Sequence, residues 1–461
     1  LESRDRQGQA VVTCNGQARM TPTGQELRMV IQGENVLLDE HLRQSLPSEV
    51  REIWSQLRPQ GRIDFVANIG RQPGQQKPEV FVDLRPHERT VSIEPTFFPY
   101  RLEEIGGRAL VSPGRVEIQN GQAKHGRSTF SAQGSWLAMP EGGWQLDFSS
   151  LNADRLSFES DLYRALPPGV QRVVDRMRPA GNFDLYQSAL RFTRGANTSQ
   201  IVSNWDVRIA CHQASLRGEL PLENLSGGIR VIGSSDGPDV KSYGELAIDS
   251  LIWNDLQLTN IRGPFWTDSS TCFLGRHATE RLRQPPQRIS ADVYGGRIET
   301  DVQLQHSVQT RYAAETSIES VDLGRLARER LGGPADMTGT VSGTLSLAGA
   351  GRSTSALTGR GNMKVTDANV YQLPPLVALL KVLRNRSPDS TAFNRCEAQF
   401  DVRGEHIHFH QLNLLGDAVS LYGRGETNFN RRLNLVFYTL VGPADLPIPL
   451  WKTVAGQLSQ Q

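Results

Sequence analysis

The sequence predicts a mainly β protein with short helices, built from repeats in which a helix is followed by strands. Three observations support this fold class. One segment occurs twice, many short segments alternate apolar with polar residues, and Gly- or Asn-containing turn signals separate those segments. Predicted strands outnumber predicted helices several-fold, so the helices are expected to accompany a sheet rather than to form a bundle.

The repeat lies at residues 46–66 and 166–186. The first copy reads LPSEVREIWSQLRPQGRIDFV and the second reads LPPGVQRVVDRMRPAGNFDLY. The offset is 120 residues without a gap, and 7 of the 21 aligned positions are identical. A repeated unit of this length is typical of an array, in which function lies in a continuous surface rather than in one pocket.

Each copy predicts a kinked helix, near residues 39–57 in the first and near 161–177 in the second. Apolar residues fall on one helical face at spacings of three and four. Pro47 and Pro167 interrupt the two helices at the same point, because proline lacks the N–H that a helix interior needs. An Arg-Pro pair ends each helix, and a strand of the pattern Gly-x-apolar-Asp-apolar follows.

Two further helices are expected closer to the C-terminus. Residues 321–331 are amphipathic, and a period-2 strand follows at 339–347. Residues 376–383 are apolar almost all round. This second segment reads either as a buried helix that covers a sheet or as a plug or membrane-facing cap on an apolar groove.

The strands share a pattern of alternation, with one polar face and one face of Val, Leu, Ile and Phe. Asn120-Gly121 and Gly295-Gly296 are read as hairpin turns between strands. The apolar face must be covered by a second sheet, by helices or by acyl chains, so a sandwich and a trough both remain open. The clearest strands are predicted at residues 115–119, 244–248, 296–302, 399–402, 407–409, 419–422 and 432–437.

Composition excludes several classes of protein. The 461 residues carry a formal net charge of +1, which gives no field that would attract nucleic acid. The four cysteines form no CxxC pair, so a structural zinc site is not expected. No stretch reaches the ~18 apolar residues of a membrane span. We expect a first repeat segment at 1–150, a second at 151–290 and a distinct region at 291–461 that is truncated.

No motif makes a convincing active site, so we expect no enzyme, no cofactor and no metal. The G-x-S-x-G match at 233–237 lacks a following helix and is read as a loop. His406, His408 and His410 share one face of a predicted strand, and all three spread too far for one zinc ion, which leaves His406 and His408 with a third ligand from elsewhere as the alternative to a solvated polar face. Asp64 and Asp184 are equivalent acids of the repeat, and an acid copied in each repeat favours a turn or register element. The glycine pairs at 359–361 and 423–425 are expected at turns or strand kinks.

A set of short motifs in the last third of the chain carries a family resemblance. They are Tyr294-Gly295-Gly296-Arg297-Ile298, Val321-Asp322-Leu323, the Gly-punctuated strand at 339–349, Asn369-Val370-Tyr371, Phe400-x-Val402-x-Gly404 and Leu412-x-Leu414-x-Gly416. Their order and spacing over about 160 residues resemble the C-terminal region of AsmA-like proteins. The preceding residues are tied to this family mainly by the helix–strand repeat.

The resemblance implies a long curved antiparallel β-sheet that forms an open hydrophobic groove. It further implies a periplasmic protein that is anchored to the inner membrane, here through a segment outside this sequence, and that moves phospholipids between inner and outer membranes. The expected partners are phospholipids or other acyl lipids, the two membranes and envelope proteins, with no nucleic acid.

Candidate residues for the groove come from the alternating strands. They are Val341, Leu345, Leu347, Phe400, Val402, Ile407, Phe409, Val419, Leu421, Leu433, Leu435 and Phe437. The same residues would also suit a dry core. The competing function is a structural or assembly scaffold for outer-membrane biogenesis without lipid transfer. A carbohydrate-active enzyme would need a carboxylate pair and aromatic platforms, which the scattered tryptophans do not suggest.

Overall fold

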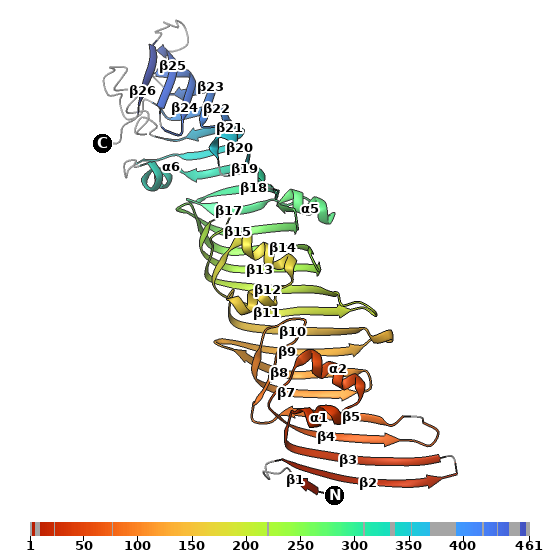
Figure 1. Cartoon of the computed structure of the whole chain (residues 1–461). Coiled ribbons are helices and arrows are strands. Elements are labelled where there is room, and N and C mark those ends of the chain that lie inside the picture. The colour runs from red at the N-terminus through yellow and green to blue at the C-terminus, as the bar shows by residue number, and fades with distance from the viewer. Residues whose placement is uncertain are drawn as a thin grey trace. The chain divides into compact units, whose positions relative to one another are not determined.

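The computed structural model describes residues 2–4, 10–22, 24–75, 77–218, 221–307, 309–331, 337–351, 353–368, 393–416, 419–430, 432–441 and 452–457. The chain divides into two compact units (Figure 1). Unit 1 holds residues 1–244 and 251–254, and unit 2 holds 245–250 and 255–461. Each is an antiparallel sheet with few short helices, which confirms the predicted fold class. The division at residues 150 and 290 stays a prediction.

Unit 1 is a meander in which nearly every strand pairs with the next one in sequence. The exception is the short β6, which pairs with β7 and forms a bridge from Ser92 to Gln60, so that β5 pairs directly with β7. Its strands are β1 (Glu2–Arg4), β2 (Val11–Thr21), β3 (Gly24–Leu37), β4 (Arg62–Arg71), β5 (Glu79–Pro86), β6 (Val91–Ile93), β7 (Leu102–Ser112), β8 (Arg115–His125), β9 (Ser128–Ala138), β10 (Trp144–Ser157), β11 (Pro179–Arg194), β12 (Ile201–Leu216) and β13 (Leu222–Asp236). β14 (Asp239–Trp253) contributes residues to both units.

Unit 2 follows the same meander, with one interruption. β16 and β17 both pair with β15 on one side and with β18 on the other, so they occupy a single position in the sheet. The strands are β15 (Leu256–Asp268), β16 (Thr271–Leu274), β17 (Ile289–Val293), β18 (Gly296–Gln305), β19 (Arg311–Asp322), β20 (Thr340–Ala350), β21 (Thr358–Thr366), β22 (Arg395–Arg403), β23 (His406–Leu415), β24 (Val419–Asn428), β25 (Arg432–Val441) and β26 (Lys452–Gln457).

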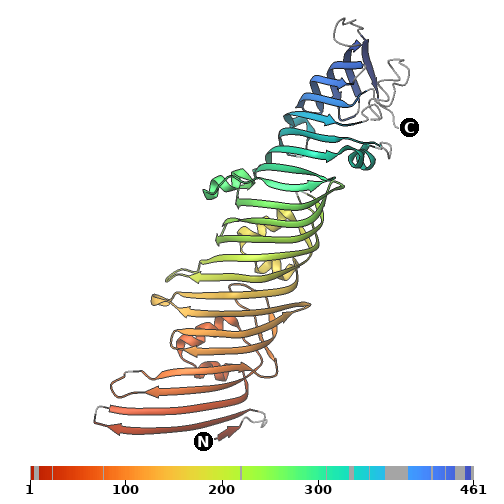
Figure 2. The ribbon, with the colours of Figure 1, turned by 180° about the vertical axis from the view of Figure 1, so that it is seen from behind.

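The repeat folds as predicted, although each kinked helix is two separate helices. The first copy forms α1 (Glu40–Ser45) and α2 (Ser48–Leu57), and the second forms α3 (Ser160–Ala165) and α4 (Pro168–Met177). Pro47 and Pro167 stand immediately before α2 and α4, where a missing N–H costs nothing. Figures 1 and 2 show both helix pairs on the same face of the unit 1 sheet.

The remaining helices are short. They are η1 (Pro140–Gly142), α5 (Arg276–Leu282), α6 (Leu323–Leu326), η2 (Ala327–Leu331) and η3 (Thr354–Ala356). The amphipathic segment predicted at 321–331 is confirmed as α6 and η2, with Asp322 capping the first turn through the Arg325 N–H at 2.9 Å. The apolar helix predicted at 376–383 lies outside the described residues. Every described helix is too short or too polar to cross a bilayer.

The unit 1 sheet has one apolar face and one polar face. Directly opposite residues on neighbouring antiparallel strands point to the same side, so the register defines each face. One apolar row crosses eight strands through Ile31, Ala67, Val82, Val111, Val116, Trp136, Leu146 and Phe192. Leu162 and Ala165 of α3 pack with Ala153 and Phe183, so the helices cover part of the apolar face.

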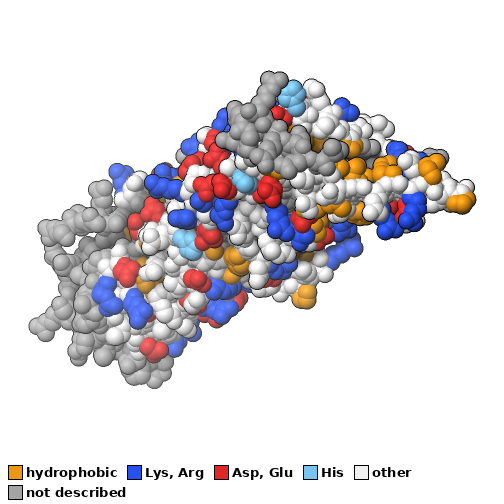
Figure 3. All heavy atoms as spheres, turned by 90° about the horizontal axis from the view of Figure 1, so that it is seen from below, with side chains coloured by type: hydrophobic (Ala, Val, Ile, Leu, Met, Phe, Trp, Pro, Cys, Tyr) orange, Lys and Arg blue, Asp and Glu red, His pale blue; other side chains and the backbone are white. Residues whose placement is uncertain are grey.

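Opposite charges pair across neighbouring strands of unit 1. Arg108 binds both carboxylate oxygens of Asp83 at 2.7 and 2.8 Å, and Arg230 binds Asp206 in the same way. Hydrophobic side chains gather in a band at one end of the space-filling view, while charges of both signs are scattered over the rest (Figure 3). This mixture agrees with a net charge of +1.

The two equivalent acids of the repeat are confirmed as register elements. Asp64 accepts the backbone N–H of Asn35 at 2.7 Å, and Asp184 accepts that of Arg155 at 2.7 Å. Both donors have a φ of 57° and lie at β-bulges, again 120 residues apart. A bulge leaves one N–H without a partner in the ladder, and the carboxylate supplies that partner.

Two readings of turn signals were wrong. Asn120-Gly121 lies inside β8 at a bulge, where Asn120 has a φ of 49°, because a bulge accepts the same left-handed residue as a hairpin turn. The segment at 233–237 is the end of β13 rather than a loop, and Ser235 is only 1% exposed. The Gly295-Gly296 turn between β17 and β18 is confirmed, and the clearest predicted strands all fall within observed strands.

Candidate functional site

The predicted groove residues lie in unit 2 on strands β20 and β22–β25. Eleven of the twelve point to one face of the sheet, as the register shows. One cross-strand row contains Leu345, Gly361, Phe400, Phe409, Gly425 and Leu435, and the next contains Leu347, Gly359, Val402, Ile407, Thr427 and Leu433. The twelfth residue, Val419, is in β24, but its side chain lies outside those that the structure describes.

Part of this apolar face is a dry core. Leu323 and Ala327, together with Met337, Ala368 and Phe393, pack onto it from above. Beneath them lies a third cross-strand row, which contains Val341, Val365, Cys396, Leu414 and Leu421. Phe437 is 2% exposed and belongs to the same cluster. These residues are already covered by the chain itself.

The other part of the face remains partly exposed. Val402 and Leu435 are buried, but six of the predicted residues keep accessible side chains. Those six are Leu345, Leu347, Phe400, Ile407, Phe409 and Leu433. We call them the open apolar strip. They occupy two adjacent rows. From β20 to β23 the strip is continuous, because the Phe400 ring lies over Gly361 of β21, but on β24 the same rows hold Gly425 and Thr427.

Glycines opposite aromatic residues flatten this surface. A Cβ atom at Gly361 would lie 2.6 Å from Cζ of Phe400, and one at Gly423 would lie 2.4 Å from Cε1 of Phe437. Each ring therefore lies across the neighbouring strand in the space that the missing side chain leaves. Gly361 and Gly423 sit inside β21 and β24 rather than at turns. The signal that reveals this role is an aromatic residue directly opposite a glycine, which depends on the strand register.

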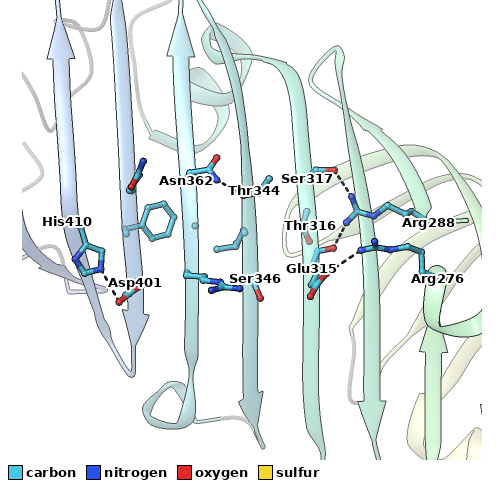
Figure 4. Close-up of a pocket in the computed structure, with 15 residues that line it drawn as sticks. Arg276, Arg288, Glu315, Thr316, Ser317, Thr344, Ser346, Asn362, Asp401 and His410 are labelled. Carbon is cyan, nitrogen blue, oxygen red and sulfur yellow. Dashed lines mark hydrogen bonds and ion pairs between the residues drawn. The ribbon is translucent and has the colours of Figure 1, made fainter. Parts of the chain in front are cut away.

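The opposite, polar face of unit 2 contains a hollow of about 660 Å³ (Figure 4). Arg276 and Arg288 line one end, and both bind Asp301, which is buried with its side chain 1% exposed. It accepts the Arg276 N–H at 2.8 Å, Arg276 Nε at 2.7 Å and Arg288 Nε at 2.9 Å. Arg276 also donates to Glu315 at 3.2 Å. Sequence reasoning missed this group, because its members come from a helix and three separate segments of strand and loop.

Histidines line the far side of the polar face. His406 and His408 stack at 6.1 Å between ring centroids and both approach Glu426, at 3.9 and 3.4 Å. His410 instead contacts Asp401 at 3.0 Å. The hydrogen bond with His410, with help from Arg403, holds the pKa of Asp401 below its ordinary value. Among the described residues, no group of three His, Cys, Asp or Glu side chains could hold a metal ion.

Within the described part of the chain, the serine of the G-x-S-x-G match hydrogen-bonds the backbone and no catalytic base. Ser235 Oγ donates to the backbone oxygen of Gly237 at 3.3 Å, and β14 follows after a short turn instead of a helix. Comparison of the chain with protein-family models, with curated protein sequences and with solved structures finds no match. The function must therefore be argued from the two faces of the sheet.

Proposed function

We propose that this chain is a non-enzymatic lipid-binding protein that holds the acyl chains of phospholipids on the open apolar strip of unit 2. The observation that carries the proposal is the continuity of the strip from β20 to β23. Leu345, Phe400 and Phe409 lie in one cross-strand row, and Leu347, Ile407 and Leu433 lie in the next. The side chains of the strip are partly exposed, and apolar side chains that gather on one face and stay accessible to solvent are typical of a binding surface.

The dimensions suit an acyl chain. Each row crosses six strands, β20–β25, and neighbouring strands lie ~4.8 Å apart, so a row is roughly 24 Å long. One acyl chain spans about 15 Å, half of the hydrocarbon core of a bilayer. Covering the strip removes apolar surface from water at about 25 cal/mol per Å². Because this attraction has no direction, a bound chain could slide along the row.

The resemblance to AsmA-like proteins supports a cellular setting for this activity. We infer a periplasmic protein that receives phospholipid at one membrane of the envelope and delivers it toward the other. Envelope proteins would hold it in place at its ends. The dry core around Leu323 and Phe393 would close one side of the path, because that part of the apolar face has no surface left to offer.

Native mass spectrometry of the purified chain tests the proposal, with one variant for each face of β20. The double variant Leu345→Asp/Leu347→Asp places carboxylates in the strip, whereas Thr344→Asp places one on the exposed opposite face of the same strand. We expect phospholipid to accompany the wild type and Thr344→Asp but not the double variant. Phe437 is unsuitable, because a charge at a side chain 2% exposed would unfold the sheet.

Circular dichroism provides the folding control for each variant. A folded wild-type chain that takes up no phospholipid from mixed vesicles would contradict the proposal and would favour a scaffold. Equal loss of lipid in Thr344→Asp and in the double variant would also contradict it, because the binding would then not depend on the apolar face.

A further inference from the structure

The hollow on the polar face of unit 2 is built from two cross-strand rows of hydrogen-bonding side chains. The first row contains Asp301, Glu315, Ser346, Arg360 and Asp401. The second contains Ser317, Thr344, Asn362 and Gln399. Both rows are nearly free of apolar side chains, so the floor of the hollow offers donors and acceptors at regular intervals.

One end of the hollow is rigid. Arg276 and Arg288 are both fixed by the buried carboxylate of Asp301, and Arg288 donates in addition to Ser317 Oγ at 2.8 Å. Figure 4 shows these two guanidinium groups beside Glu315 and Ser317 at one end and Asp401 beside His410 at the other. Fixed walls lower the entropy cost of ordering side chains around a ligand.

The centre of the floor carries unused hydrogen-bonding capacity. Within the described part of the chain, the side chains of Ser346, Arg360 and Gln399 make no hydrogen bond or ion pair. Asn362 donates to Thr344 Oγ1 at 2.7 Å, which leaves its carbonyl oxygen available. The free groups are therefore adjacent and include both donors and acceptors.

The charges around the hollow balance. Arg276, Arg288 and Arg360 line the hollow with Glu315 and Asp401, and the buried Asp301 that binds two of these arginines supplies the third negative charge, so the positive field on a phosphate or another anion is weak. A neutral ligand with many hydroxyl groups suits both the balanced charge and the mixture of donors and acceptors, because each hydroxyl can donate and accept. Neighbouring strands are ~4.8 Å apart, which is about the length of one sugar unit along an extended glycan.

From this geometry we propose that the hollow binds a neutral glycan chain, which lies across β19–β22 and places one sugar unit over each strand. Arg360 and Gln399 bind hydroxyl oxygens from the centre of the floor, and Asp401 accepts hydroxyl protons at one end. The polar side chains of this site point to the face opposite the open apolar strip, although Leu345 and Phe400 of the strip also border the hollow. Glycan binding is argued from the polar side chains alone and does not rest on the proposed lipid function. A glycan and a lipid could occupy the chain together.

Isothermal titration calorimetry of the full chain with cellohexaose, chitohexaose and maltohexaose tests the proposal. We expect one of these glycans to bind, and we expect the Arg360→Ala/Gln399→Ala variant to bind it at least about tenfold more weakly, because it loses hydrogen bonds from a charged and an amide side chain. Lys364→Ala is the matched control, because Lys364 is exposed on the same face of β21 but does not line the hollow. It should bind like the wild type.

Three outcomes would overturn the proposal. The first is the absence of binding to all three glycans at millimolar concentration. The second is equal affinity of the wild type and the Arg360→Ala/Gln399→Ala variant. The third is binding of inorganic polyphosphate at the same hollow without binding of any glycan, which would identify an anion site instead. Lipid uptake measured on the same preparations separates failure of this proposal from failure of the proposed function.

Discussion

The buried carboxylate of Asp301 is expected to be the most sensitive polar position in unit 2. It accepts three hydrogen bonds, from the backbone N–H of Arg276 and from the Nε atoms of Arg276 and Arg288. The change Asp301→Ala removes all three acceptor contacts and leaves the guanidinium groups facing a small cavity. The Arg276 N–H then has no partner from this carboxylate at the start of α5.

The expected loss of unfolding free energy depends on how exposed the two arginines are. Breaking a fully buried ion pair costs 3–5 kcal/mol, but Arg276 and Arg288 are 44% and 22% exposed and can recover water. The stranded backbone N–H adds ~1–3 kcal/mol. We therefore expect Asp301→Ala to destabilise unit 2 by about 3 kcal/mol. Asp301→Asn keeps one acceptor for the N–H and should cost about half as much.

Urea unfolding followed by hydrogen-exchange mass spectrometry measures this change, because peptides from β18 report on unit 2 separately from unit 1. The control is Asp249→Ala, which removes an ion pair to Arg262 from a side chain that is 69% exposed. That variant should lower the free energy of unfolding by no more than ~0.5 kcal/mol. If the two variants differ by less than this amount, Asp301 does not organise the end of the hollow.

Three further predictions concern packing, thiol reactivity and pH. Gly423→Ala should lower the free energy of unfolding in urea by ~1–3 kcal/mol, because the added Cβ meets the Phe437 ring. Gly70→Ala is the control and should be neutral, because no atom lies within 4 Å of its added Cβ. Equal losses in the two variants would contradict the packing of the Phe437 ring over Gly423. Burial raises the pKa of the Cys396 thiol to about 12, so iodoacetamide at pH 8 should label it only after unfolding. Labelling of the native chain would show that the core opens. The hydrogen bond from Arg108 lowers the pKa of Asp83, so its stabilising effect is complete above about pH 4 and is lost as the pH falls through the lower native value. Melting curves of Asp83→Asn should converge with those of the wild type in acid, and a constant difference would refute this.

The strands and their faces could be predicted because both follow from a local period of two residues. Leu345, Phe400 and Phe409 were assigned to one face from alternation alone, and the register places them in one row. The role of Asp64 could be predicted for a similar reason, since a residue copied at a fixed offset serves the repeated fold.

The division of the apolar face into a dry core and an open strip could not be predicted. The dry core forms where Leu323 and Phe393 pack onto the sheet. The positions of these two residues in the sequence do not indicate which strands they cover. The polar hollow was missed for the same reason, because Arg276 and Asp401 come to line one hollow only through the order of the strands. Asn120-Gly121 shows a further limit, since one dipeptide suits both a turn and a bulge.

The contacts from Asp64 to Asn35 and from Asp184 to Arg155 each close around one helix pair. The donor precedes the helix pair and the acceptor follows it, so neither copy depends on its neighbour to satisfy the bulge. A gene duplication of this segment would therefore produce a second copy in which this bulge is already capped by that copy's own aspartate. A protein that grows by duplication of this segment therefore needs no compensating substitution elsewhere. Its length can change in steps of one segment.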